Sequence, residues 1–162
     1  MAEMNYSEIV EVYERLAKTS KRLEKTAIIA DFLKTLKNKG KSEWIYLLKG
    51  KVVADYDSRE TGISEQLAIK VIAKSFGVNS EEVVKKFRKI GDLGDIALDI
   101  SEKKRQTTLF SKKLTTDKVF ENLRKIMEVE GGGAVDRKMG LVSELLGSAS
   151  GKEAKYIVRT LL

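Results

Sequence analysis

Two pairs of basic residues stand where the sequence predicts the first turns of two helices: Arg22 with Lys25, and Arg137 with Lys138. The start of a helix has free backbone N–H groups and a partial positive charge, so it attracts anions such as phosphate. Basic side chains in a first turn run against the usual electrostatic preference of a helix, and a bound anion would explain them. The alternative is that these side chains only face solvent. We interpret both pairs as phosphate contacts.

A second candidate site is the short pattern of Gln106, Leu109 and Phe110 in an irregular segment. It resembles a shortened form of the motif Gln-x-x-aliphatic-aromatic, which binds sliding clamps of the proliferating-cell-nuclear-antigen type. In such a motif the glutamine enters a small polar pocket, while the two apolar side chains fill an apolar one. The alternative is that Leu109 and Phe110 pin the segment to the core of the domain itself. From the residues alone, both interpretations stay open.

The composition excludes several kinds of chemistry, because the sequence contains no cysteine and no histidine. Disulfides, thiol nucleophiles, imidazole bases and the common zinc and haem ligand sets are therefore ruled out. The carboxylates form no recognisable metal-binding pattern, so we expect no catalytic residue and no metal site in this chain. The longest apolar segments span only a few residues, so we expect a soluble, cytoplasmic protein without a membrane partner.

The positive charge of the chain is concentrated at its two ends. The net charge is +7; residues 1–50 carry ten basic and seven acidic side chains, residues 51–104 carry ten of each, and residues 105–162 carry eleven and seven. A basic surface attracts polyanions, of which nucleic acid is the usual one. Lysine-rich helices are also often merely solvated, so charge alone is a weak argument.

The elements that position these residues should all be helices. The chain has no proline and 42% hydrophobic residues, which favours an all-α fold of about nine helices, with residues 1–162 in one domain. A helix is expected over residues 5–18, and the next one, after Ser20, should turn Leu23, Ala27, Ala30 and Leu33 inward. Capping residues place the others at residues 42–50, 64–76, 79 onwards, 92–104, 116–130, 136–146 and 150–162. Ser42 is the expected cap of the first of these helices, and Asn79 with Glu82 and Ser150 with Glu153 are expected capping boxes.

An internal repeat relates the two ends of the chain. Residues 25–33 (KTAIIADFL) match residues 138–146 (KMGLVSELL) class for class at an offset of 113, and residues 9–16 match residues 119–126 at an offset of 110. We therefore expect two pseudo-symmetric three-helix units that flank a central helical segment. A pseudo-two-fold axis would place the two basic pairs on the two strands of a nucleic acid duplex.

Six segments, in this order along the chain, resemble the N-terminal DNA-binding domain of archaeal and eukaryotic ATP-dependent DNA ligases. They are residues 19–26 (TSKRLEKT), 62–65 (GISE), 91–97 (GDLGDIA), 114–120 (with LT and VF), 136–138 (DRK) and 153–159 (EAKYIVR). The resemblance implies an all-helical domain that grips the minor groove around a nick, mostly through phosphates and without reading sequence. Archaeal ligases are also similar at residues 106–110, which supports the clamp-binding hypothesis.

Two departures from the family pattern bear on these expectations. Ala134 stands where the family commonly has a serine, so the backbone amides of Gly132 and Gly133 are the expected contacts at this turn. The chain also stops at Leu162 and contains no Asp-Gly pair, whereas the family continues to a nucleotidyltransferase core with a Lys-x-Asp-Gly motif. We therefore expect ATP and magnesium to be cofactors of the parent ligase and not of this chain.

The leading hypothesis is a module that binds nicked double-stranded DNA in replication and repair and that also docks on a sliding clamp. The alternative is a helical module that binds only protein, through the 106–110 loop and apolar helix faces. Loss of binding with rising salt would distinguish a phosphate contact from a protein contact.

Overall fold

A computed structural model describes residues 3–104 and 113–162, and over these ranges it holds nine helices and no strand. The expected all-α fold is confirmed. The element η1 is a 3-10 helix and the others are α-helices: α1 (Tyr6–Ala17), α2 (Arg22–Lys39), η1 (Ser42–Lys49), α3 (Glu65–Phe76), α4 (Ser80–Ile90), α5 (Leu93–Lys104), α6 (Thr116–Glu128), α7 (Ala134–Ser148) and α8 (Gly151–Leu161).

Short polar side chains begin several of these helices. Ser64 Oγ accepts a hydrogen bond from the N–H of Leu67 at 3.2 Å and so caps α3. Ser150 and Glu153 form the predicted capping box, in which the N–H of Ser150 donates to Glu153 Oε1 at 2.8 Å. Each cap satisfies N–H groups that a helix start otherwise leaves free.

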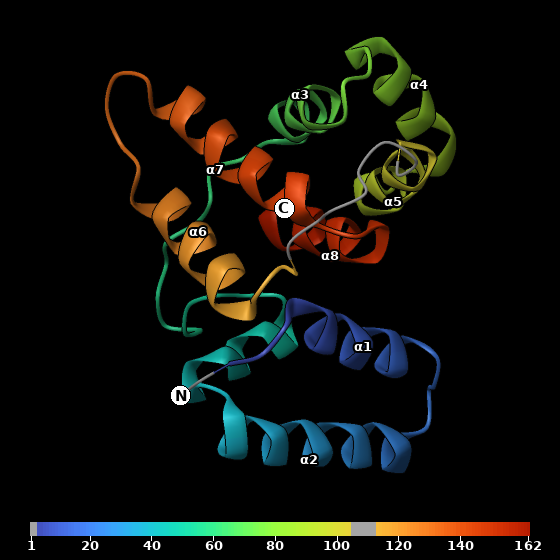
Figure 1. Cartoon of the computed structure of the whole chain (residues 1–162), viewed down its shortest axis with the longest axis vertical. Coiled ribbons are helices and arrows are strands. Elements are labelled where there is room, and N and C mark those ends of the chain that lie inside the picture. The colour runs from blue at the N-terminus through green and yellow to red at the C-terminus, as the bar shows by residue number, and fades with distance from the viewer. Residues whose placement is uncertain (1–2, 105–112) are drawn as a thin grey trace.

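The second unit (α6, α7 and α8) lies between the first unit (α1, α2 and η1) and the three helices that are central in the sequence, α3, α4 and α5 (Figure 1). α1, α2 and η1 lie together at the lower end of the view, and α2 forms the outer edge. α3, α4 and α5 pack on one another, and α8 lies along α5 in the most extensive helix contact of the described chain. α7 packs against both α6 and α3. The two units therefore match in the order of their elements, while α7 packs on the central helices and α2 stands at the edge.

A short backbone pairing joins the starts of α1 and α6. The N–H of Tyr6 donates to the carbonyl of Leu114 at 2.8 Å, and the N–H of Thr116 donates to the carbonyl of Met4 at 2.8 Å. In Figure 1, α1 and α6 leave this point in opposite directions, and each turns back at its far end into the next helix. The starts of α2 and α7 therefore lie at opposite ends of the molecule.

The prediction for the buried face of α2 was wrong. The helix packs through Ile28, Phe32 and Leu36, which are at most 8% exposed. The four residues expected inside face solvent: Leu23 is 85% exposed, Leu33 is 40% exposed, and Ala27 and Ala30 are exposed as well. Apolar residues occur on several sides of this helix, so their spacing does not select one face. The larger side chains at intervals of four residues occupy the core instead.

Two glycines allow α5 and α8 to approach closely. A Cβ atom at Gly94 would lie 2.8 Å from the carbonyl oxygen of Lys155, and one at Gly151 would lie 2.8 Å from Leu98 Cδ1. Beside Gly94, the carboxylate of Asp92 accepts hydrogen bonds from the N–H of Gly94 at 2.9 Å and from Arg159 Nε at 3.1 Å. The 91–97 segment is thus a helix start that is tied to α8.

Candidate nucleic-acid interface

The first turn of α2 presents two cations to solvent. Arg22 is the first residue of the helix and Lys25 the fourth, and both are exposed. Among the described residues, neither side chain has an ion-pair or hydrogen-bond partner. Lys21, the N-cap residue, makes no side-chain cap. Free N–H groups and unpaired cations therefore lie at the same place, as an anion site requires.

The segment before α2 is ordered by its own hydrogen bonds. The hydroxyl of Thr19 accepts a hydrogen bond from the N–H of Lys21 at 3.1 Å and donates one to the carboxylate of Glu24. Lys21 Nζ also lies 3.8 Å from Glu24 Oε1. Glu24, the acidic residue of this turn, is thus already paired. The side chains that have no partner among the described residues are the cations Arg22 and Lys25.

The rest of α2 continues the positive surface. The helix contains five basic and two acidic residues, and its second acid, Asp31, pairs with Arg15 of α1 at 3.4 Å. Lys34 and Lys37 are exposed and have no ion pair within the described ranges. The outer edge of the first unit is therefore a basic surface.

The start of α7 is a glycine turn that leaves its backbone open. Gly131 and Gly133 have φ values of 84° and 77°, a region that favours glycine, and a Cβ at either would meet no atom within 4 Å. Gly133 is the N-cap and provides no side-chain cap, and Ala134 begins the helix. The N–H of Ala134 donates to the carbonyl of Gly131 at 3.2 Å, so the N–H groups that remain for a ligand at this start are those of the following residues and of the exposed Gly132.

The basic pair of α7 differs from that of α2 because both of its side chains bind backbone carbonyls. Arg137 Nη2 donates to the carbonyl of Glu130 at 2.7 Å, and Lys138 Nζ donates to the carbonyl of Thr61 at 2.8 Å. Gly62 makes room for the lysine, since a Cβ there would lie 2.9 Å from its Nζ. These two residues therefore hold loops in place as well as carrying charge.

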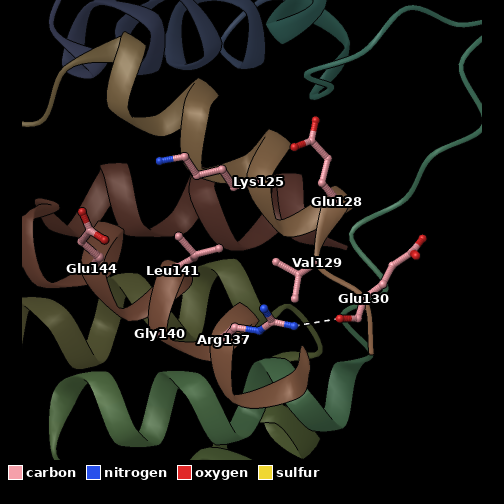
Figure 2. A pocket seen from close by; sticks show the side chains of 8 residues that line it. All are labelled: Lys125, Glu128, Val129, Glu130, Arg137, Gly140, Leu141 and Glu144. Carbon is pink, nitrogen blue, oxygen red and sulfur yellow. Dashed lines mark hydrogen bonds between the residues drawn. The ribbon is translucent and has the colours of Figure 1, made fainter. Parts of the chain in front are cut away.

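A pocket of about 660 Å³ lies between α6 and α7, next to the glycine turn (Figure 2). Val129 and Leu141 supply apolar surface, and Figure 2 shows Arg137 reaching across to the carbonyl of Glu130. Three acidic residues line this pocket (Glu128, Glu130 and Glu144) against two basic ones (Lys125 and Arg137). This balance disfavours phosphate inside the pocket, so the candidate anion site of the second unit is the exposed turn and not the pocket.

Known proteins resemble this chain over its whole length. A family model described as "DNA ligase N terminus" matches residues 5–162. The chain is 39% identical over 159 residues to a DNA ligase of Methanobrevibacter smithii and 38% identical over 162 residues to one of Thermococcus onnurineus, covering 98% and 100% of this chain but 29% of each relative. It is 41% identical over 160 residues to a DNA ligase of Thermococcus fumicolans, of which it covers 28%.

The chain belongs to the DNA ligase N terminus family. The resemblance found in the six segments is thereby confirmed, and the segments lie within the matched residues. The chain spans less than a third of the length of these DNA ligases.

The residue pattern that predicts clamp binding lies outside the part of the chain that the structure describes. Gln106, Leu109 and Phe110 all fall outside the described residues. Within those residues, no group of three or more acidic side chains is placed to hold a metal ion, and no helix is long and apolar enough to cross a membrane.

Sequence patterns missed the partners that position the second basic pair. Both partners are backbone carbonyls, those of Thr61 and Glu130. Because every residue has a backbone carbonyl, the residue types in the sequence cannot indicate which ones bind Arg137 and Lys138. The sequence signal for this contact was Gly62, which stands in a segment shared with the family. In the structure Gly62 has a φ of 67°, a conformation that favours glycine.

Proposed function

We propose that this chain is the part of an ATP-dependent DNA ligase that holds nicked duplex DNA through its phosphates, without reading base sequence. The observation that carries the proposal is the first turn of α2, where Arg22 and Lys25 are exposed and have no ion-pair partner among the described residues, beside a helix start without a side-chain cap. Because the chain belongs to a family found in DNA ligases, DNA is the polyanion that we expect it to bind.

The arrangement of the two units supports contact with both strands of one duplex. The backbone pairing between the starts of α1 and α6 has local two-fold symmetry, and α2 and α7 begin at opposite ends of the molecule (Figure 1). The two strands of a duplex are also related by two-fold axes. In this proposal Arg22 and Lys25 contact one strand, and the turn of Gly132, Gly133, Arg137 and Lys138 contacts the other.

The test is a fluorescence anisotropy titration of two nicked duplexes of unrelated sequence at several salt concentrations. Arg22→Ala and Lys25→Ala should each weaken binding equally on both duplexes and reduce the slope of log affinity against log salt by about one. Lys49→Ala is the matched control, because this exposed lysine is already paired with Asp55 at 2.6 Å. A wild-type slope in both α2 variants would overturn the proposal.

The competing function is a module that binds only protein. It predicts no salt-dependent shift of a nicked duplex by the wild-type chain, whereas the proposed function predicts binding in the micromolar range or weaker at physiological salt. One gel-shift series in rising salt separates the two.

We also propose that ligation chemistry, with its ATP and magnesium, belongs to another part of the parent protein. The chain has no Asp-Gly pair and therefore no Lys-x-Asp-Gly motif. Incubation with labelled ATP and magnesium should leave it unlabelled. A covalently labelled lysine would show that this chain is itself catalytic.

A further inference from the structure

The amino group of Lys138 is held by a turn from a distant part of the chain. Lys138 Nζ donates to the carbonyl of Thr61 at 2.8 Å, and the two residues are 77 positions apart in sequence. Lys138 is half-buried, whereas Arg22 at the start of α2 is exposed and has no partner among the described residues. The two proposed contact turns therefore differ, because the cation of the second one already has a fixed place.

The hydroxyl of Thr61 fixes the turn that provides this carbonyl. The residue is 7% exposed, and its Oγ1 donates to the carbonyl of Leu161, at the end of α8, at 2.6 Å. The same oxygen accepts a hydrogen bond from the N–H of Ile63 at 3.3 Å. The carbonyl of Thr61 is thus directed toward Lys138 by contacts in which the lysine takes no part.

Gly62 leaves the space that the amino group occupies. Its φ is 67°, and a Cβ there would lie 2.9 Å from Lys138 Nζ, the end of a flexible side chain that can be displaced. Gly77, which ends α3, has nearly the same φ of 65°, but a Cβ there meets no atom of the described residues within 4 Å. The two glycines therefore share a backbone conformation and differ in the contact with the lysine.

We propose that Thr61 and Gly62 are positioning residues, which hold the amino group of Lys138 in place for a phosphate. This inference rests on the proposed function. A lysine amino group has three N–H donors, and Thr61 takes one of them, so two remain for phosphate oxygens. A free lysine loses rotational freedom when it binds. Here the fold imposes part of that loss before DNA arrives, which strengthens the contact.

The test compares Gly62→Ala with Gly77→Ala by fluorescence anisotropy on a nicked duplex, with thermal unfolding in parallel. Both variants place alanine in the left-handed region, so their melting temperatures should fall by similar amounts. Gly62→Ala should also weaken DNA binding about two- to tenfold, the loss expected when one side chain is no longer ordered in advance. Gly77→Ala should bind DNA like the wild type.

The salt dependence separates loss of position from loss of charge. Gly62→Ala retains the charge of Lys138, so the slope of log affinity against log salt should stay at the wild-type value. Lys138→Met removes the charge and should reduce this slope by about one.

Double variants show whether the effect of the turn passes through Lys138. Gly62→Ala should cause no further loss of affinity in Lys138→Met and its full loss in Arg22→Ala. Thr61→Val, which removes the hydroxyl and keeps the shape of the side chain, should weaken binding in the same way as Gly62→Ala. Thr61→Ser, which has the hydroxyl, should restore the affinity that Thr61→Val loses.

Equal DNA affinity of the two glycine variants would overturn the inference. The same holds if Gly62→Ala weakens binding equally with and without the amino group of Lys138, because the turn would then only stabilise the fold. Absence of salt-dependent binding by the wild-type chain is a different result: it would overturn the proposed function, and this inference with it.

Discussion

The backbone of Asn5 pairs antiparallel with the backbone of Thr115, and these residues are equivalent positions of the internal repeat. An offset of 110 converts Asn5 into Thr115, and it also exchanges the two hydrogen bonds that flank them, Tyr6 to Leu114 and Thr116 to Met4. A pair of equivalent residues that contact each other lies on the local two-fold axis. Both residues are also the N-caps of their helices, so one pairing sets the direction in which α1 and α6 leave the axis.

Thr116→Pro tests the contribution of this pairing. Proline is tolerated at the first position of a helix, so α6 should persist. The substitution removes the N–H that binds the buried carbonyl of Met4, which should lower the free energy of unfolding by about 1–3 kcal/mol. Glu65→Pro, at the same position of the exposed start of α3, should change it by less than about 0.5 kcal/mol. Urea unfolding gives both values, and equal stability of the two variants would contradict the role of the pairing.

Substitution of two helical glycines by alanine should have opposite effects on stability. Gly94→Ala places a Cβ 2.8 Å from the backbone of α8, and we expect a loss of about 1–3 kcal/mol from overpacking. At Gly140 a Cβ meets no atom within 4 Å, so alanine should stabilise the protein by about 0.5–1 kcal/mol through its better helix propensity. Thermal unfolding of the two variants measures the difference. A stable Gly94→Ala protein would mean that α8 can move away from α5 at little cost.

The stability of the domain should fall in acid, in part through Asp92. Partial burial alone would raise the pKa of Asp92, but hydrogen bonds from Arg159 and from the N–H of Gly94 outweigh it and hold the pKa below its ordinary value. A carboxylate with a lowered pKa in the folded state stabilises the protein at pH above its unfolded pKa of about 3.9, and this contribution is lost as pH falls through the folded pKa.

Asp92→Asn should therefore flatten the decline of unfolding free energy between about pH 5 and pH 2, measured by urea titration at each pH. The decline should be reduced and not abolished, because a hydrogen bond from Tyr156 also lowers the pKa of Glu14. An unchanged pH profile in the variant would show that Asp92 has the same pKa in the folded and unfolded states.

Lys138 and Arg22 should respond differently to removal of their charge. Lys138→Met removes the amino group that binds the carbonyl of Thr61, so it should lower stability by about 1–2 kcal/mol and DNA affinity together. Arg22→Ala removes an exposed side chain that has no partner within the described ranges, so it should lower DNA affinity and leave stability within about 0.5 kcal/mol of wild type. Paired thermal and anisotropy measurements distinguish these outcomes. Equal stability of the two variants would exclude a structural role for Lys138.

Clamp docking is tested at residues 106–110. Phe110→Ala, with or without Gln106→Ala, should abolish binding to a sliding clamp and leave DNA affinity nearly unchanged, because an aromatic anchor is a hot spot of such an interface. Calorimetry with a clamp of the proliferating-cell-nuclear-antigen type measures the effect. A Phe110→Ala protein that unfolds would support the alternative in which this side chain belongs to the core.

Sequence patterns predicted the helices well, because their ends depend on local chemistry. Ser64, Thr115 and Ser150 cap their helices with their own side chains, and Gly50, Gly77 and Gly91 end helices in the left-handed conformation. Two helix starts differ from the prediction by one residue. Lys41 and not Ser42 is the N-cap of η1, and the side chain of Asn79 accepts from the N–H of Glu81 at 3.2 Å and not from that of Glu82.

Tertiary packing decided what local patterns could not. The buried face of α2 depends on where α1 and η1 lie, and no spacing within the helix indicates this. Arg22 has no partner in the part of the chain that the structure describes, whereas Lys138 binds the carbonyl of Thr61, which lies 77 residues away in sequence. The candidate site was thus predictable as residue types at helix starts, while the partners of each side chain required the fold.

The edge position of α2 has a consequence for amide hydrogen exchange. A helix that covers its neighbours on one side only opens locally at lower free energy than one enclosed by the core, so the amides of α2 should exchange faster than those of α8, whose residues from Ala154 to Val158 are mostly buried. A duplex bound as we propose should hold α2 closed and slow its exchange more than that of any enclosed helix. Isotope exchange with and without DNA would therefore map the contact on the unaltered protein, and the energy of ordering α2 would appear as part of the measured affinity.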